Sequence, residues 1–265
     1  MDSGRFFKQP VYPWRSIFLD ERYIFCHNEV TVYKYVEEYA PELFTKIQEL
    51  VKKGKWHIMG GWYLQPDCNM PSGESFVRQI LEAKRYFLEK FGVHPTTAIN
   101  FDPFGHTVGL VQIMKKCGQD SYIFTRPYGS QLDLDDDLFY WEGLDGSKIK
   151  ALRAHGYNSP LGNSREVIER RANDDEHETC VVLWGVGNHG GGPTIKNIQL
   201  IEEYNKKEDR KYDLKMANPV EFFEKIEADG EYIYAYELNC GYLAAIQIVD
   251  IPMETAVTFT AKPYV

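Results

Sequence analysis

Stretches with helical spacing alternate with short extended runs along most of this chain, and this alternation restricts the folds that it can adopt. Extended runs are expected over residues 23–25, 58–64, 96–101, 122–124, 148–153, 180–186 and 214–217. Helices are expected over residues 30–53 with a break at Pro41, 72–91, 108–116, 164–172, 195–204 and 220–228. Strands that alternate with helices form a mostly parallel sheet or barrel, whose functional loops lie at the carboxyl ends of the strands. The sequence therefore predicts an α/β fold with a mostly parallel sheet or barrel.

The length and the net charge of the chain limit the number of domains and the classes of partner that we expect. Its 265 residues, 43% of them hydrophobic, suffice for one large domain and do not require a second. The net charge of -9 argues against a nucleic-acid groove or an anionic membrane surface as the natural partner. We therefore expect a small neutral or cationic ligand, no nucleic acid and no membrane, while a homo-oligomer stays open.

The cysteines and the first residues indicate a compartment. The five cysteines include no CxxC pair, so the sequence suggests neither a disulfide framework nor a thiolate zinc site. Residues 1–8 lack the apolar run of a signal peptide, and no run in the chain is long enough to span a bilayer. The sequence therefore predicts a cytoplasmic protein.

The most informative motif is the stretch from Asn100 to His106. Asp102 follows the expected strand 96–101 and precedes a proline, so its carboxylate should lie at the carboxyl end of that strand. His106 follows in a turn that contains a glycine, close enough to hydrogen-bond to, or to orient, whatever the aspartate holds. These two residues are the first candidates for chemistry.

Two further strand ends carry candidate side chains. Trp62 and Asp67 close the run 58–64 with an indole and a carboxylate, the pair that a carbohydrate site uses to stack on a sugar ring and to bind its hydroxyls. A tight turn in which Trp62 only packs is an equally open interpretation. Arg126 follows the strand 122–124 and could hold a carboxylate ionised or contact substrate oxygens, although a surface ion pair is commoner.

Three other loops are less specific or lack a known motif. Residues 155–160 offer hydrogen-bonding groups, but turn chemistry explains their Asn, Ser and Pro as well. Residues 133–137 are acidic without the spacing of an EF-hand, which favours a solvated loop. The glycine-rich loop 184–193 would present Asn188 and His189 at its rim, and it lacks both the Walker lysine and the GxGxxG spacing of nucleotide-binding loops.

Taken together, these loops resemble glycoside hydrolase family 38, the retaining α-mannosidases. The matching segments are Gly60 to Trp62 with Pro66 and Asp67, Ser72 to Ser75, Asp102 to His106, Thr125 with Arg126, and Gly185 to Thr194. The resemblance implies a seven-stranded β/α barrel, of which residues 1–240 would be a partial catalytic domain and residues 241–265 a diverged C-terminal tail. It also implies a substrate with terminal α-linked mannose, such as an oligosaccharide or a glycan.

The resemblance assigns roles residue by residue. Asp102 matches the family's catalytic nucleophile, which is also a ligand of a catalytic zinc ion. Arg126 matches an arginine that would keep this aspartate ionised. The substrate contacts that the resemblance implies are Trp62, Asp67, Phe104, Arg126, Tyr157, Asn158 and Asn188.

The chain also departs from the family pattern. Where the family carries an aspartate as general acid/base, this sequence has Asn188 and His189, which makes His189 the candidate because asparagine cannot transfer protons. No His-x-Asp pair precedes Tyr23, so Asp102 is the one expected zinc ligand and the zinc site is incomplete. We therefore expect a fragment of a longer enzyme that does not hydrolyse an aryl α-mannoside by itself.

Two other classes of function stay open. A metal-dependent carbohydrate deacetylase uses a related barrel with aspartates at strand ends, although the segment from Gly60 to Glu74 favours the mannosidase. A catalytically dead sugar-binding remnant would explain the missing ligands and the Asn188 and His189 substitution.

Overall fold

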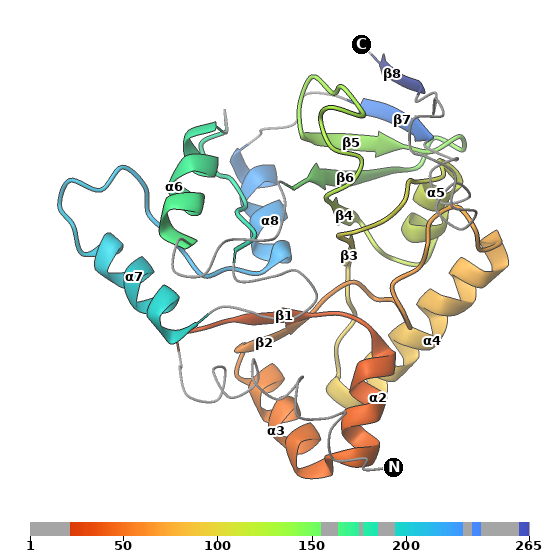
Figure 1. Ribbon diagram of the computed structural model, residues 1–265. Coiled ribbons are helices and arrows are strands. Elements are labelled where there is room, and N and C mark those ends of the chain that lie inside the picture. Colours follow the sequence, from red (N-terminus) through yellow and green to blue (C-terminus); the bar gives the residue numbers. More distant parts are fainter. Residues whose placement is uncertain are drawn as a thin grey trace, which may run out of the picture. The chain divides into compact units, whose positions relative to one another are not determined.

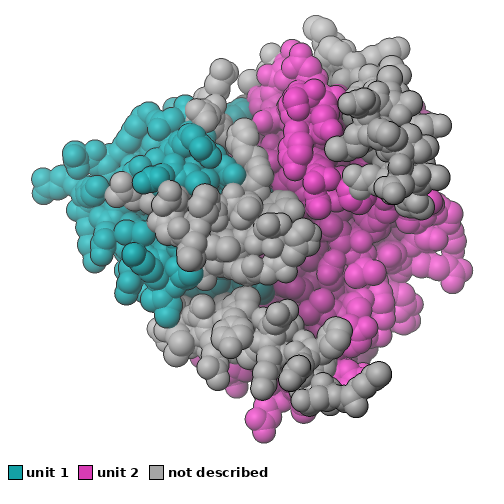
Figure 2. Space-filling model, viewed as in Figure 1, with its two compact units in different colours: residues 1–25, 155–218 teal, residues 26–154, 219–265 magenta. Residues whose placement is uncertain are grey.

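The computed structural model describes residues 22–154, 164–174, 177–184, 194–229, 235–239 and 260–264. The chain divides into two compact units, coloured separately in Figure 2. Residues 1–25 and 155–218 form one unit, and residues 26–154 and 219–265 form the other. None of the described helices is long and apolar enough to cross a bilayer.

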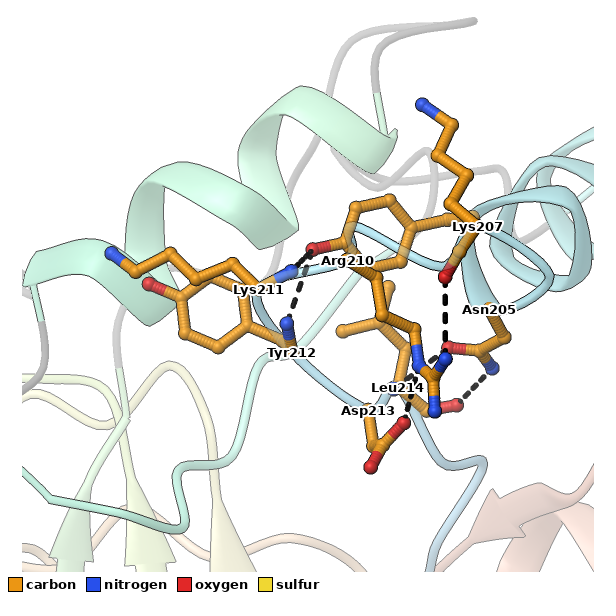
Figure 3. A network of polar contacts seen from close by, with 8 residues as sticks. Asn205, Lys207, Arg210, Lys211, Tyr212, Asp213 and Leu214 are labelled. Carbon is orange, nitrogen blue, oxygen red and sulfur yellow. Dashed lines mark hydrogen bonds and ion pairs between the residues drawn. The ribbon is translucent and has the colours of Figure 1, made fainter.

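The first unit contains helices α6 (Ser164–Asp174) and α7 (Ile195–Asn205), both close to their predicted bounds. Thr194 begins α7 with a capping box, in which its hydroxyl accepts from the backbone of Asn197 and the Asn197 side chain accepts from the backbone of Thr194. After α7, the chain turns back on the helix, and the Tyr204 hydroxyl accepts from the backbone of Lys211 and Tyr212, each at 3.2 Å (Figure 3).

The sequence predicted two strands in this unit, and both predictions are wrong for the residues that the structure describes. Residues 180–184 and 214–217 adopt no strand, and in each segment a side chain bonds to the backbone of one residue. Asn205 accepts from the Leu214 nitrogen at 3.0 Å and donates to the Leu214 carbonyl at 2.7 Å (Figure 3). Arg171 donates to the Leu183 carbonyl at 2.7 Å.

The second unit begins with a two-stranded sheet and three helices. Strands β1 (Phe25–His27) and β2 (Trp56–Ile58) pair, and helices α2 (Val30–Tyr39), α3 (Pro41–Lys52) and α4 (Gly73–Phe91) follow the predicted ranges. Pro41 lies at the first position of α3, where a proline is tolerated because the N–H that it lacks would have no partner within the helix. Ser72 caps α4, and Gly92 ends it in the left-handed conformation at φ 70°. The later helices of this unit are α5 (Gly109–Lys116) and α8 (Pro219–Asp229).

The main sheet has six strands in the order β3-β4-β6-β5-β7-β8 (Figure 1). Their bounds are β3 Thr97–Asn100, β4 Ser121–Phe124, β5 Leu138–Glu142, β6 Lys148–Arg153, β7 Ala235–Asn239 and β8 Thr260–Tyr264. The pairs β3–β4, β4–β6 and β5–β7 are parallel, whereas β5–β6 and β7–β8 are antiparallel. The α/β class is confirmed, but the sheet is mixed, and the strands that the structure describes do not close into a barrel.

The hydrophobic core of this unit joins the sheet to α4 and α5. It contains apolar side chains from β3, β4, β5 and β6, together with residues of both helices and of the loop after β2. Its largest members are Trp62, Phe76, Tyr122, Phe124, Phe139 and Trp141. The core therefore fixes the strands from which the carboxyl-end loops of β3 and β4 emerge.

Candidate active site

Asp102 and Arg126 meet where β3 and β4 end. The strands are parallel, and Asn100 is paired with Phe124. Asp102 follows Asn100 by two residues, and Arg126 follows Phe124 by two residues. The Asp102 Oδ1 and Arg126 Nε atoms are 2.8 Å apart, an ion-pair contact. The two side chains are 43% and 32% exposed, and because Oδ1 itself is buried, the exposure of Asp102 lies in its other atoms. A ligand could therefore reach the carboxylate beside the guanidinium.

Aromatic rings hold the Arg126 guanidinium in place. Its Cζ atom lies 5.6 Å from the ring centroid of Phe104 and 5.6 Å from that of Tyr128. Its Nε atom also donates to the Tyr128 hydroxyl at 3.2 Å. Phe104, a predicted substrate contact, is therefore engaged by the arginine; the substrate contact stays a prediction.

His106 lies behind this pair and contacts the backbone of Arg126. Its Nε2 atom is 2.8 Å from the Arg126 carbonyl oxygen, and its Nδ1 atom is 3.2 Å from the Tyr122 hydroxyl. The ring is buried, and this burial lowers the pKa of His106 from 6.5 to about 4 despite the opposing hydrogen bond to Arg126. His106 is therefore a neutral residue that supports the loop of Arg126.

The loop after β2 is held by its own side chains. Trp62 is fully buried, packs against Phe76 with ring centroids 6.5 Å apart, and donates from Nε1 to the Ile99 carbonyl at 3.1 Å. The half-buried Asp67 accepts through Oδ1 from the backbone of Asn69 at 2.8 Å and of Met70 at 3.0 Å. Packing and turn formation thus occupy both side chains, and their role as substrate contacts stays a prediction.

The structure also identifies polar residues near the site that the sequence did not predict as site residues. Tyr122 and Asn100 are fully buried on neighbouring strands, and the thiol of Cys68 lies between them. The available signal was a polar group within an otherwise apolar strand, because such groups are buried only with a hydrogen-bond partner.

Four predicted site residues lie outside the described residues: Tyr157, Asn158, Asn188 and His189. Among the residues that the structure does describe, no group of three or more His, Cys, Asp or Glu side chains is arranged to hold a metal ion. Asp102 is paired with Arg126, and one carboxylate does not make a zinc site. The described residues therefore do not by themselves fit zinc.

A cavity of about 250 Å³ lies elsewhere in the second unit, between α2 and α4. Charged side chains line most of it, and they pair with one another: Lys90 with Glu37 at 2.7 Å and Arg85 with Glu82 at 2.6 Å. A hollow lined by such pairs is typical of a solvated surface. The geometry at Asp102 is therefore the better candidate for chemistry.

Comparison with known proteins gives consistent matches. Residues 15–239 match the model of the glycosyl hydrolases family 38 N-terminal domain. Alpha-mannosidase G of Dictyostelium discoideum is 31% identical over 77% of this chain and 19% of that protein. Human alpha-mannosidase 2C1 is 29% identical over 80% of this chain and 21% of that protein. The chain thus spans about a fifth of the length of these curated relatives.

Solved structures show the same fold. An alpha-mannosidase from Enterococcus faecalis V583 matches with a TM-score of 0.67 and 18% identity, over 83% of this chain and 26% of that one. A 4-alpha-glucanotransferase from Thermococcus litoralis matches with a TM-score of 0.64 and 14% identity, over 83% of this chain and 36% of that one. At these identities the likeness concerns the fold alone.

Proposed function

The chain belongs to glycoside hydrolase family 38, and from this membership we propose that it forms part of the catalytic domain of an α-mannosidase. The substrate would be a terminal α-linked mannose of an oligosaccharide or a glycan. The names of the relatives support this class and do not favour a carbohydrate deacetylase or a dead sugar-binding remnant. Within the whole protein, the open sheet would form part of the family's β/α barrel.

Asp102 is the proposed nucleophile. An oxygen of its carboxylate would bond to the anomeric carbon as the glycosidic bond breaks, and the departing oxygen would take a proton from a general acid. Water would then attack the same carbon, give up a proton to the same group acting as base, and release Asp102, which retains the configuration of the sugar. The observation that carries this proposal is the partly exposed Asp102 side chain at the end of β3, beside Arg126.

The remaining parts of the mechanism rest on residues beyond the described ranges. His189 is the proposed general acid/base, since a histidine side chain can both donate and accept a proton near neutral pH. Zinc is proposed with Asp102 as one ligand and the others from outside the described residues. A zinc ion held there would bind sugar hydroxyls and help to distort the ring. A cytoplasmic location is proposed from the five cysteines without a CxxC pair.

The test is the loss of activity in Asp102→Asn, measured in the full-length enzyme that contains this chain. We expect the hydrolysis of an aryl α-mannoside to fall by several orders of magnitude, because the amide is a poor nucleophile. Asp137→Asn is the matched control, since Asp137 also pairs with an arginine, Arg153, at 2.5 Å. Its turnover should stay near that of the wild type.

A trapping experiment identifies the nucleophile directly. A fluorinated mannosyl fluoride slows the second displacement, so the sugar should remain attached to the peptide that contains Asp102 and be found there by mass spectrometry. A label on another carboxylate, or wild-type turnover in Asp102→Asn, would remove Asp102 from this role.

A further inference from the structure

We propose that Tyr122 and His106 are positioning residues, which fix the backbone of Arg126 and thereby the contact between Arg126 and Asp102. They do so through a buried hydrogen-bond relay that runs behind the candidate active site. The importance of the relay for catalysis rests on the proposed function, whereas its geometry does not.

The donor and the acceptor of each hydrogen bond in the relay follow from the group at its Arg126 end, a carbonyl. The Arg126 carbonyl can only accept, so the proton of the neutral His106 ring must be on Nε2, which is 2.8 Å away. The Nδ1 atom is then an acceptor, and the Tyr122 hydroxyl, 3.2 Å away, must donate to it. This arrangement selects one tautomer of His106 and one orientation of the Tyr122 hydroxyl.

The far end of the relay is anchored to β3. The Tyr122 oxygen is 3.8 Å from the Cys68 sulfur, which accepts from Asn100 Nδ2 at 2.8 Å. Asn100 also donates to the Pro66 carbonyl at 3.2 Å, and this acceptor fixes which way its amide points. Asn100 ends β3 shortly before Asp102, so the relay connects the strand ends that carry both members of the ion pair.

Burial keeps the relay dry and in one arrangement. Tyr122 is fully buried and His106 is 1% exposed. The His106 ring lies edge-on to Phe124 and Trp141, with centroids 4.9 Å and 5.6 Å away. Burial lowers the pKa of His106 to about 4, so the neutral form that the relay requires is present at neutral pH.

The relay acts on Arg126 at its backbone, and the aromatic rings act on its side chain. The carbonyl held by His106 adjoins the Cα atom from which the guanidinium extends towards Phe104 and Asp102. Release of that carbonyl would let the start of the Arg126 loop shift, and a shift of about 1 Å is enough to disturb a positioned group.

The experiment measures the Arg126 Nε–H resonance by NMR in the chain itself. The resonance is assigned by its absence in Arg126→Lys. We expect Tyr122→Phe and His106→Leu to shift or broaden it, because both break the relay. His106→Gln should preserve it, since a glutamine amide supplies one donor and one acceptor in place of the ring nitrogens.

Tyr33→Phe is the matched control. Tyr33 is fully buried on α2, and its hydroxyl accepts from Trp56 Nε1 at 2.8 Å and donates to the His27 carbonyl at 3.4 Å, so the substitution removes buried hydrogen bonds between residues other than those of the relay. It should lower stability but leave the Arg126 resonance unchanged. Near-ultraviolet circular dichroism verifies that each variant is folded.

Three results would overturn the proposal: an unchanged Arg126 resonance in Tyr122→Phe, a His106→Gln variant that behaves like His106→Leu, or a His106 ring that carries its proton on Nδ1. None of these measurements requires mannosidase activity. An inactive enzyme with the expected resonances would therefore refute the proposed function and leave the relay standing.

Discussion

Asp102 and Arg126 occupy corresponding positions beyond two neighbouring parallel strands, and their 2.8 Å contact follows from the register of those strands. The pairing of Asn100 with Phe124 carries both chains to the same edge of the sheet. The backbone thus brings the carboxylate and the guanidinium together before any side chain adjusts. Side-chain contacts with Phe104 and Tyr128 then select the orientation of the arginine.

The first prediction separates the effect of the Arg126 charge on activity from its effect on the stability of the chain. Arg126→Met should cost at most about 1 kcal/mol of unfolding free energy, because partly exposed ion pairs contribute little. It should nevertheless lower kcat/KM of the full-length enzyme on the order of 10²-fold, since it removes a positive charge placed beside the proposed nucleophile. Urea unfolding and aryl α-mannoside hydrolysis measure the two effects.

Arg126→Lys serves as the control for this prediction. It keeps the charge but loses the planar group that stacks on Phe104 and Tyr128, so its activity should fall between those of the wild type and Arg126→Met. Equal activity in the wild type and in Arg126→Met would show that the arginine has no part in the reaction.

The second prediction concerns Trp62, for which the sequence left two interpretations open. The indole is fully buried and hydrogen-bonded, so Trp62→Ala should cost about 3–5 kcal/mol of unfolding free energy. Leu64→Ala, in the same loop but at a residue that is 50% exposed, should change stability by less than about 0.5 kcal/mol. Urea unfolding compares the two, and equal stabilities would contradict a core role for Trp62.

Local patterns sufficed for much of the second unit. The apolar face and the Ser72 cap predicted α4, and buried runs predicted β3, β4 and β6. The strand β5 was missed, although Asp145 and Gly146 form the turn of its hairpin with β6, where Gly146 has φ 77°. The Asp-Gly dipeptide is a hairpin signal. It was missed because strands were expected to alternate with helices, and a hairpin joins two strands directly.

The failures have a tertiary cause. Residues 214–217 have the apolar pattern of a strand, but the Asn205 side chain satisfies the backbone of Leu214, which no local pattern indicates. At the site, strand ends predicted Asp102 and Arg126, whereas the link from Tyr122 to His106 depends on packing between distant segments. Sequence therefore indicates which side chains reach the edge of the sheet, and packing decides what supports them.

The third prediction uses two glycines with similar backbone angles. Gly54 has φ 67° and Gly60 has φ 81°, so an alanine at either position is strained by about 1–2 kcal/mol. A Cβ atom at Gly54 would meet nothing within 4 Å, whereas at Gly60 it would lie 2.5 Å from the Asn28 Cβ atom. Gly60→Ala should therefore lower the unfolding free energy by clearly more than Gly54→Ala, as measured in urea. Equal losses would mean that Asn28 yields without cost.

The last prediction is that the chain loses stability as the pH falls from 6.5 towards 4. Burial lowers the pKa of both His27 and His106 from 6.5 to about 4. Between these values the unfolded chain binds protons that the folded chain does not, so stability is highest above pH 6.5 and falls as the pH drops towards 4. Each histidine can contribute roughly 3 kcal/mol to this loss.

The pH window and the controls make the effect attributable to the histidines. Burial opposes the shift, but hydrogen bonds to Lys90 and Tyr86 lower the pKa of Glu37 from 4.5. Protonation of Glu37 therefore weakens the fold as the pH falls below about 4.5. For this reason, unfolding in urea is compared at pH 7 and pH 5, which both lie above that range. His106→Gln should lose less stability in this window than the wild type, because one of the three histidines whose pKa is lowered by burial, His27, His57 and His106, no longer titrates. His94→Gln, at an exposed position, should follow the wild type. A wild-type pH dependence in His106→Gln would show that His106 takes up its proton in the folded state as readily as in the unfolded one.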